Sequence, residues 1–160
     1  MIGTALVGHL KSEGYTVQKL VRRASRAADE ISWDPQSGTV DLKALAGVDA
    51  IIHLAGAGVG DKRWTKKYKS EILNSRLLGT TAIANAVNTV KPSVFISASA
   101  IGWYGETGNR AVIETDRAGE DFLAVVCREW EGAADLVSDV RTVKLRTGLV
   151  LDPTGGALGR

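Results

Sequence analysis

The chain has 160 residues, of which 44% are hydrophobic and 24% are charged, and its formal net charge at pH 7 is +2. These values fit one α/β domain with a real core, and the small charge gives no reason to expect a nucleic acid or an acidic protein as a partner. The single cysteine excludes an internal disulfide and no apolar run is long enough to cross a membrane, so we expect a cytoplasmic protein without a membrane partner.

The first half of the chain alternates between helical and strand patterns. Apolar residues at helical spacing predict a helix from Ile2 to Gly14. A long helix is expected over residues 65–90, with a break near Gly79. Between the two helices, strands are expected over residues 15–21, 31–33 and 48–55.

The second half continues this alternation. A short apolar run that starts at Val94 is typical of a buried parallel strand. An irregular, glycine-rich segment over residues 105–120 precedes a helix that Asp121 would cap, and residues 140–151 form the last expected strand. Strands that alternate with helices predict an α/β fold with a Rossmann-like, doubly wound parallel sheet in one domain over residues 1–160.

The start of the chain does not fit a complete dinucleotide-binding fold. The first helix begins at Met1 with no strand before it, whereas such a fold places a strand and a glycine-rich turn upstream of that helix. Gly3 fits the last glycine of that turn, so we include it among the candidate cofactor-binding residues. A fold that simply begins with a helix is equally compatible with the spacing.

Polar side chains gather where the central apolar run ends. Ser97 and Ser99 close the run, and Tyr104 lies between Gly102 and Gly105. Ligands of open α/β sheets bind outside the carboxyl ends of the strands. The sequence therefore predicts a site at this strand end.

A set of short motifs is spread over nearly the whole chain: Met1-Ile-Gly-Thr-Ala-Leu, Val21-Arg-Arg23, His53-Leu-Ala-Gly-Ala57, Arg63-Trp-Thr65, Ser75-Arg76, Ser97-Ala-Ser-Ala-Ile-Gly-Trp-Tyr-Gly105, Asp121-Phe-Leu123, Trp130-Glu131 and Arg146-Thr-Gly148. Together they resemble the extended short-chain dehydrogenase/reductases, and more narrowly the NAD-dependent epimerase/dehydratase-like or nucleoside-diphosphate-sugar epimerase-like proteins. Members of that family carry an upstream strand with a Gly-x-x-Gly-x-x-Gly turn and a downstream substrate lobe. The resemblance therefore implies a fragment: an incomplete Rossmann domain that lacks the first strand and the C-terminal substrate lobe.

Two arginines bear on the choice of cofactor. Arg22 and Arg23 follow the second strand of the implied fold, where an acidic residue would bind the ribose 2′-hydroxyl of NAD and an arginine favours the 2′-phosphate of NADP. We therefore expect NADP(H) to be preferred over NAD(H). A solvated basic turn is the alternative interpretation.

The resemblance implies further cofactor contacts, each with a simpler interpretation beside it. Leu54, Ala55 and Gly56 match the adenosine and ribose side but also fit a tight turn. Arg146 and Leu149 match the nicotinamide side, although Arg146 fits a sheet edge as well. The remaining candidates are Ser97 at the strand end and Glu71 and Arg76, which fit a surface pair equally well. No metal site is expected, because the only histidines are His9 and His53.

Ser99 and Tyr104 are the catalytic candidates. In the superfamily a serine at this strand end polarises the substrate oxygen, and the tyrosine of a helical Tyr-x-x-x-Lys pair transfers the proton with help from the lysine cation. Here Phe122 and Val126 occupy those two helical positions. Tyr104 is the remaining acid/base candidate, and no lysine is placed beside it by sequence spacing.

The resemblance implies an NADP(H)-binding domain of epimerase or oxidoreductase type that acts on a sugar nucleotide or a similar small molecule. Without the tyrosine–lysine pair, a non-catalytic dinucleotide-binding or regulatory protein is the alternative. Five cations between residues 62 and 69 fit a solvated helix face or an anionic partner, and the run is too short to predict a nucleic acid. The sequence leaves the substrate and the oligomeric state open.

Overall fold

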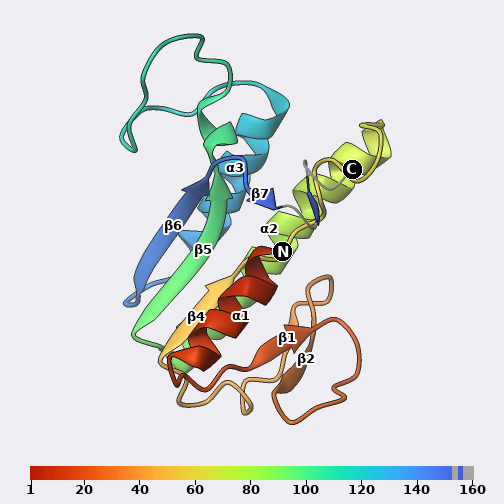
Figure 1. Ribbon diagram of the computed structural model, residues 1–160, viewed down its shortest axis with the longest axis vertical. Helices are drawn as coiled ribbons and strands as arrows, with labels where there is room; N and C mark the ends of the chain where they lie inside the picture. Colours follow the sequence, from red (N-terminus) through yellow and green to blue (C-terminus); the bar gives the residue numbers. More distant parts are fainter. Residues whose placement is uncertain (153–154, 157–160) are drawn as a thin grey trace. The chain divides into compact units, whose positions relative to one another are not determined.

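The structure is a computed structural model that describes residues 1–152 and 155–156 (Figure 1). The chain divides into two compact units, one made of Met1–Trp33 with Gly148–Arg160 and the other of Asp34–Thr147. None of the helices in the described part is both long and apolar enough to cross a membrane.

In the first unit, α1 (Ile2–Ser12) leads into β1 (Lys19–Val21), which pairs in parallel with β2 (Glu30–Asp34). The strand expected from residue 15 is shorter than predicted. Gly14 turns the chain with a positive φ of 85°, and Tyr15 stays 65% exposed, because only Lys19–Val21 finds a hydrogen-bonding partner.

The second unit holds the remaining described elements apart from the short β7 and β8: β3 (Thr39–Val40), β4 (Ala50–His53), α2 (Lys66–Val90), β5 (Val94–Ala100), the 3₁₀ turn η1 (Ile101–Tyr104), α3 (Phe122–Ala134) and β6 (Arg141–Thr147). Its sheet has the order β4-β5-β6, and both pairs are parallel. The mixed α/β class with a parallel sheet agrees with the prediction.

The last expected strand is interrupted. β6 ends at Thr147, and β7 (Leu151–Asp152) pairs antiparallel with β8 (Gly155–Gly156) in the first unit. The apolar content of residues 140–151 predicted one continuous strand. Instead, the chain leaves β6 at Gly148, and the segments on either side pair with different strands.

The core of the second unit lies between its sheet and the two long helices. Strand alternation places Phe95, Ser97 and Ser99 on one face of β5, all of them buried, and α3 packs against that strand while α2 packs along α3. Figure 1 shows α3 behind β5 and β6. Phe95 and Ile72 are completely buried between these layers.

Helix α2 runs unbroken from its N-cap to its left-handed C-cap. The Thr65 side chain accepts a hydrogen bond from the Tyr68 amide, and Lys91 ends the helix with a φ of 50° just before Pro92. The predicted break near Gly79 is wrong. Gly79 is buried inside the helix, so tertiary packing outweighs the low helix propensity of glycine, which is about 1 kcal/mol.

Candidate functional site

Ser99 is the second-last residue of β5, and its side chain faces α3. It is only 3% exposed, and its Oγ donates a hydrogen bond of 2.6 Å to Oε1 of Glu131. Its hydroxyl proton is therefore bound inside the protein. The prediction that Ser99 orients a substrate oxygen stays a prediction.

Arg146 meets the same carboxylate from the neighbouring strand. The β5–β6 register sets Arg146 directly beside Ser99, and its Nε and Nη2 donate to Oε1 and Oε2 of Glu131 at 2.8 and 2.9 Å. Burial raises the pKa of Glu131, but the hydrogen bonds from Arg146 and Ser99 outweigh burial and leave this pKa below its usual value. The carboxylate in turn raises the pKa of Arg146, so the pair is fully ionised.

Tyr104 completes this network from the end of η1. Arg146 donates through Nη1 to the Tyr104 hydroxyl oxygen at 3.0 Å, and its guanidinium lies 3.9 Å from the ring centre of Trp103. The sequence left Tyr104 without a cation because it offered no lysine at the right spacing. The cation is an arginine 42 residues further along the chain.

The irregular segment over residues 105–120 folds back to fix Tyr104. The Gly119 amide donates to the Trp103 carbonyl at 2.8 Å, and Trp103 Nε1 donates to the Asp116 carbonyl at 3.1 Å. A Cβ on Gly119 would lie 2.7 Å from the Tyr104 carbonyl oxygen and 2.9 Å from Gly105 Cα. Glycine is therefore required for this close approach of two backbone segments.

Phe122 and Val126 stand at the two helical positions where the family has its tyrosine and lysine, and both pack against neighbouring side chains. The Phe122 ring meets Trp64 edge-on at 5.4 Å, with the Lys69 ammonium 5.0 Å from its centre. Val126 is 2% exposed and lies in a cluster with Tyr68 and Ile72. Neither position provides a group that can transfer a proton.

The turn that follows β4 is held by α2. The amide of Ala57 donates to Ser75 Oγ at 3.0 Å, and Arg76 donates to the Ala57 carbonyl at 2.9 Å. A Cβ on Gly56 would lie 3.1 Å from Arg76 Cζ, so Gly56 allows this contact. Burial lowers the pKa of Arg76, whose guanidinium also lies 4.9 Å from the Trp130 ring. Arg76 therefore fixes the turn that directly follows Leu54, Ala55 and Gly56, the predicted cofactor-binding residues.

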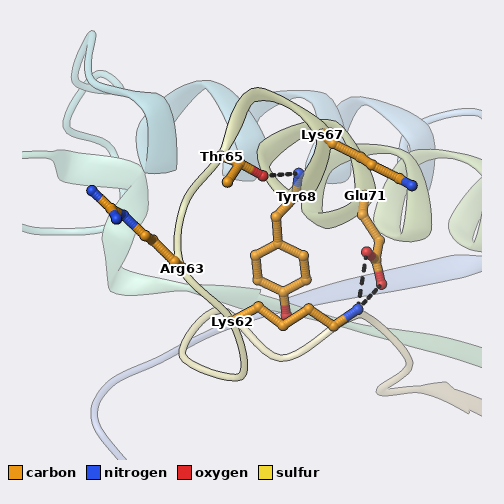
Figure 2. A pocket seen from close by; sticks show the side chains of 6 residues that line it. All are labelled: Lys62, Arg63, Thr65, Lys67, Tyr68 and Glu71. Atoms are coloured by element: carbon orange, nitrogen blue, oxygen red, sulfur yellow. Dashed lines mark hydrogen bonds and ion pairs between the residues drawn. The ribbon is translucent and has the colours of Figure 1, made fainter.

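Glu71 lies in an open hollow of about 390 Å³ at the start of α2 (Figure 2). Lys62 Nζ approaches its carboxylate at 3.3 Å and lies 5.0 Å from the Tyr68 ring centre. Figure 2 shows Arg63 and Lys67 extending to opposite sides of the hollow, so their charges do not converge on one point. This arrangement favours the solvated helix face over a single anion site.

Ser97 and His53 lie side by side in the core. They are paired in the β4–β5 register, and they are 1% and 4% exposed. Ser97 donates to the Ala98 carbonyl of its own strand, so its surroundings lend no support to the predicted cofactor contact. Burial lowers the pKa of His53 to about 4, which makes it a neutral core residue at pH 7.

The other candidates belong to the first unit. Gly3 lies in the exposed first turn of α1, and Leu149 is 76% exposed. Arg23 binds Glu30 with both terminal nitrogens, at 2.7 and 2.8 Å, whereas the Arg22 side chain makes no hydrogen bond or ion pair within residues 1–152 and 155–156. The two arginines are therefore not equivalent.

Glu131 is the site residue that the sequence analysis missed. It follows Cys127 by four residues and precedes Ala134 by three, so it lies among the buried residues of α3. A carboxylate on the apolar face of a helix needs partners, and this was the available signal.

The model of the NAD dependent epimerase/dehydratase family matches residues 1–122 of the chain. An epimerase family protein of Mycobacterium leprae is 40% identical over 162 residues, which cover 100% of this chain and 53% of that protein. The chain thus spans about half the length of the curated relatives it matches.

Two solved structures share the fold over almost all of the chain. The nucleoside-diphosphate sugar epimerase from Corynebacterium glutamicum has a TM-score of 0.85 at 36% identity and covers 99% of this chain and 34% of that one. The human epimerase family protein SDR39U1 (isoform 2), solved with NADPH, has a TM-score of 0.85 at 30% identity and covers 99% of this chain and 54% of that one. These likenesses confirm the predicted Rossmann-like fold and the predicted family resemblance.

Proposed function

Because the chain belongs to the NAD dependent epimerase/dehydratase family, we propose that it forms the NADP(H)-binding part of an enzyme of epimerase or oxidoreductase type. Its substrate is a sugar nucleotide or a similar small molecule. The observation that carries the proposal is the network of Ser99, Glu131, Arg146 and Tyr104 near the carboxyl ends of parallel strands. Two similar proteins add support, since one is named a nucleoside-diphosphate sugar epimerase and the other was solved with NADPH.

The proposed chemistry is proton transfer at an oxygen of the substrate. Nicotinamide, when bound, supplies or accepts a hydride. Tyr104 is the acid/base group, since its oxygen accepts from the Arg146 cation and it donates no hydrogen bond within the described residues. Ser99 keeps the carboxylate of Glu131 in place, so its contribution is exerted from inside the protein.

Each unit, taken by itself, holds residues that fit one part of a dinucleotide. The Arg22 guanidinium has no hydrogen-bond or ion-pair partner among the described residues and fits the 2′-phosphate of NADP, because an arginine fork matches phosphate geometry. In the second unit, Ala55 and Gly56 fit the adenosine and ribose side of the cofactor, and Arg76 holds the turn that follows them through the Ala57 carbonyl. The charge of Arg23 is neutralised by Glu30. The hydrogen bonds that Arg23 donates lower the pKa of the Glu30 carboxyl to about 2.

The unequal arginines give a test of cofactor preference. Arg22→Ala should weaken NADPH binding about tenfold and leave NADH binding nearly unchanged, since only NADPH carries the 2′-phosphate. Arg23→Ala should change both affinities by a similar and smaller factor, because Arg23 is engaged with Glu30. Fluorescence titration of each variant with both cofactors measures the two ratios, and equal losses for NADPH and NADH in Arg22→Ala would contradict the assignment.

Turnover tests the proposed function itself. The longer protein of which the proposal makes this chain the cofactor-binding part is incubated with NADPH or NADP⁺ and a panel of UDP- and dTDP-sugars, and nicotinamide absorbance and product sugars are followed. Hydride exchange or epimerisation of at least one sugar nucleotide is expected. Tight NADPH binding without turnover across the panel would favour the non-catalytic dinucleotide-binding protein, an alternative that Phe122 and Val126 at the family's catalytic positions keep open.

A further inference from the structure

Glu131 is an ionised group in a buried position. It is 3% exposed, and its two oxygens accept one hydrogen bond from Ser99 and two from Arg146. A buried carboxylate is costly unless it is paired and hydrogen-bonded. The partners come from β5 and β6, so this one helical residue ties α3 to two adjacent strands.

The carboxylate fixes the direction of the Arg146 guanidinium. One edge of the guanidinium, Nε and Nη2, is bound to Glu131, and Nη1 donates to the Tyr104 hydroxyl at 3.0 Å and to the Glu114 carbonyl at 2.9 Å. The face of the group lies on Trp103. Because a guanidinium is planar and rigid, fixing one edge also sets where Nη1 points.

The next ion pair along the same two elements provides an internal comparison. Lys144, two residues before Arg146 on β6, binds Asp135 at 2.7 Å, and Asp135 is the C-cap residue of α3, four residues after Glu131. The Asp135 side chain is 61% exposed, and neither partner of this pair bonds a tyrosine within the described residues. Ion pairs of this kind on the protein surface contribute little to folding stability.

We infer that Glu131 is a positioning residue that acts through Arg146 to hold the Tyr104 hydroxyl in place, an inference that rests on the function proposed for Tyr104. Without the carboxylate, the inner edge of the guanidinium loses its partner, and Nη1 is no longer directed at the Tyr104 oxygen. The cation beside Tyr104 is thus Arg146 of β6, and Glu131 of α3 holds it in position. Helix α3 itself carries neither a tyrosine nor a lysine.

The first arm of the test needs no substrate. Tyrosine labelled with ¹³C in the ring gives three residues to observe by NMR, and the Tyr104→Phe variant identifies the Tyr104 signal. In Glu131→Gln the Tyr104 signal should shift or broaden while those of Tyr15 and Tyr68 stay unchanged. Asp135→Asn is the matched control and should leave all three signals in place.

The second arm separates positioning from general stability. With the most rapidly converted sugar nucleotide of the panel, Glu131→Gln should lower kcat about 10²-fold and change the KM for NADPH less than threefold, since misplacement by about 1 Å can cost that much in rate. In the Tyr104→Phe background, Glu131→Gln should cause no further loss. Equal additional loss in that background would show a merely structural role and overturn the inference.

Circular dichroism shows whether the Glu131→Gln protein is folded. If it is not, Arg146→Lys serves as a second variant that disturbs the same contact. It keeps the positive charge, but one ammonium cannot bind both Glu131 oxygens and also reach Tyr104, so the same change in the Tyr104 signal is expected. An unchanged Tyr104 signal in a folded Glu131→Gln or Arg146→Lys protein refutes the inference. If the longer protein that contains this chain converts no sugar nucleotide, the proposed function fails, and the NMR arm still decides whether Glu131 positions Tyr104.

Discussion

Turnover by the Tyr104→Phe variant should fall by about 10²- to 10⁴-fold, the range that a positioned general acid or base contributes. The substitution removes a single oxygen, the one that accepts from Arg146 Nη1, and leaves the ring in place beside the guanidinium at 5.2 Å. Folding and NADPH affinity should therefore stay close to those of the parent chain. The rate of nicotinamide absorbance change with a saturating sugar nucleotide measures the loss.

Two other tyrosines serve as controls for this experiment. Tyr15→Phe changes an exposed residue outside any strand, and Tyr68→Phe changes a buried one whose hydroxyl donates to the Gly58 carbonyl. Neither should lower turnover as Tyr104→Phe does, although Tyr68→Phe should lower stability. A Tyr104→Phe protein that retains more than a tenth of the parent rate would remove Tyr104 from the catalytic role and leave the acid/base group unassigned.

Local signals were sufficient to predict most of the fold. The Asp121 side chain accepts from the Ala124 amide as an N-cap should, and the buried parallel strand expected from Val94 is β5. Both features depend on neighbouring residues. The predictions that failed, such as the break at Gly79, depended on packing against distant segments.

The candidate site shows the same division at the level of single residues. Ser99 and Tyr104 were identified from the end of the central apolar run and Arg146 from the family resemblance, but the sequence did not show that they are connected. The Ser99–Glu131 and Arg146–Tyr104 contacts span 32 and 42 residues of sequence. The β5–β6 register sets Ser99 beside Arg146, and this brings both side chains to the carboxylate of Glu131. The register of two strands cannot be read from the spacing of apolar residues in the sequence.

Stability should depend on pH through His53, which is buried at the end of β4. Burial lowers its folded-state pKa from 6.5 to about 4, so between these values the unfolded chain takes up a proton that the folded chain does not. The free energy of unfolding should therefore fall as the pH drops from 6.5 towards 4. At about 1.4 kcal/mol per pH unit, the total loss approaches 3 kcal/mol.

Urea unfolding at half-unit steps between pH 7.5 and 5.5 measures this slope above the range in which the carboxylates of the unfolded chain take up most of their protons. In His53→Gln the slope between pH 6.5 and 5.5 should largely disappear, whatever the substitution does to stability at pH 7.5. His9→Gln, which changes the exposed histidine on α1, should keep the slope of the parent chain. A parent chain whose stability is flat from pH 6.5 to 5.5 would mean that His53 takes up its proton in the folded state, and burial beside Ser97 would then be no obstacle to the charge.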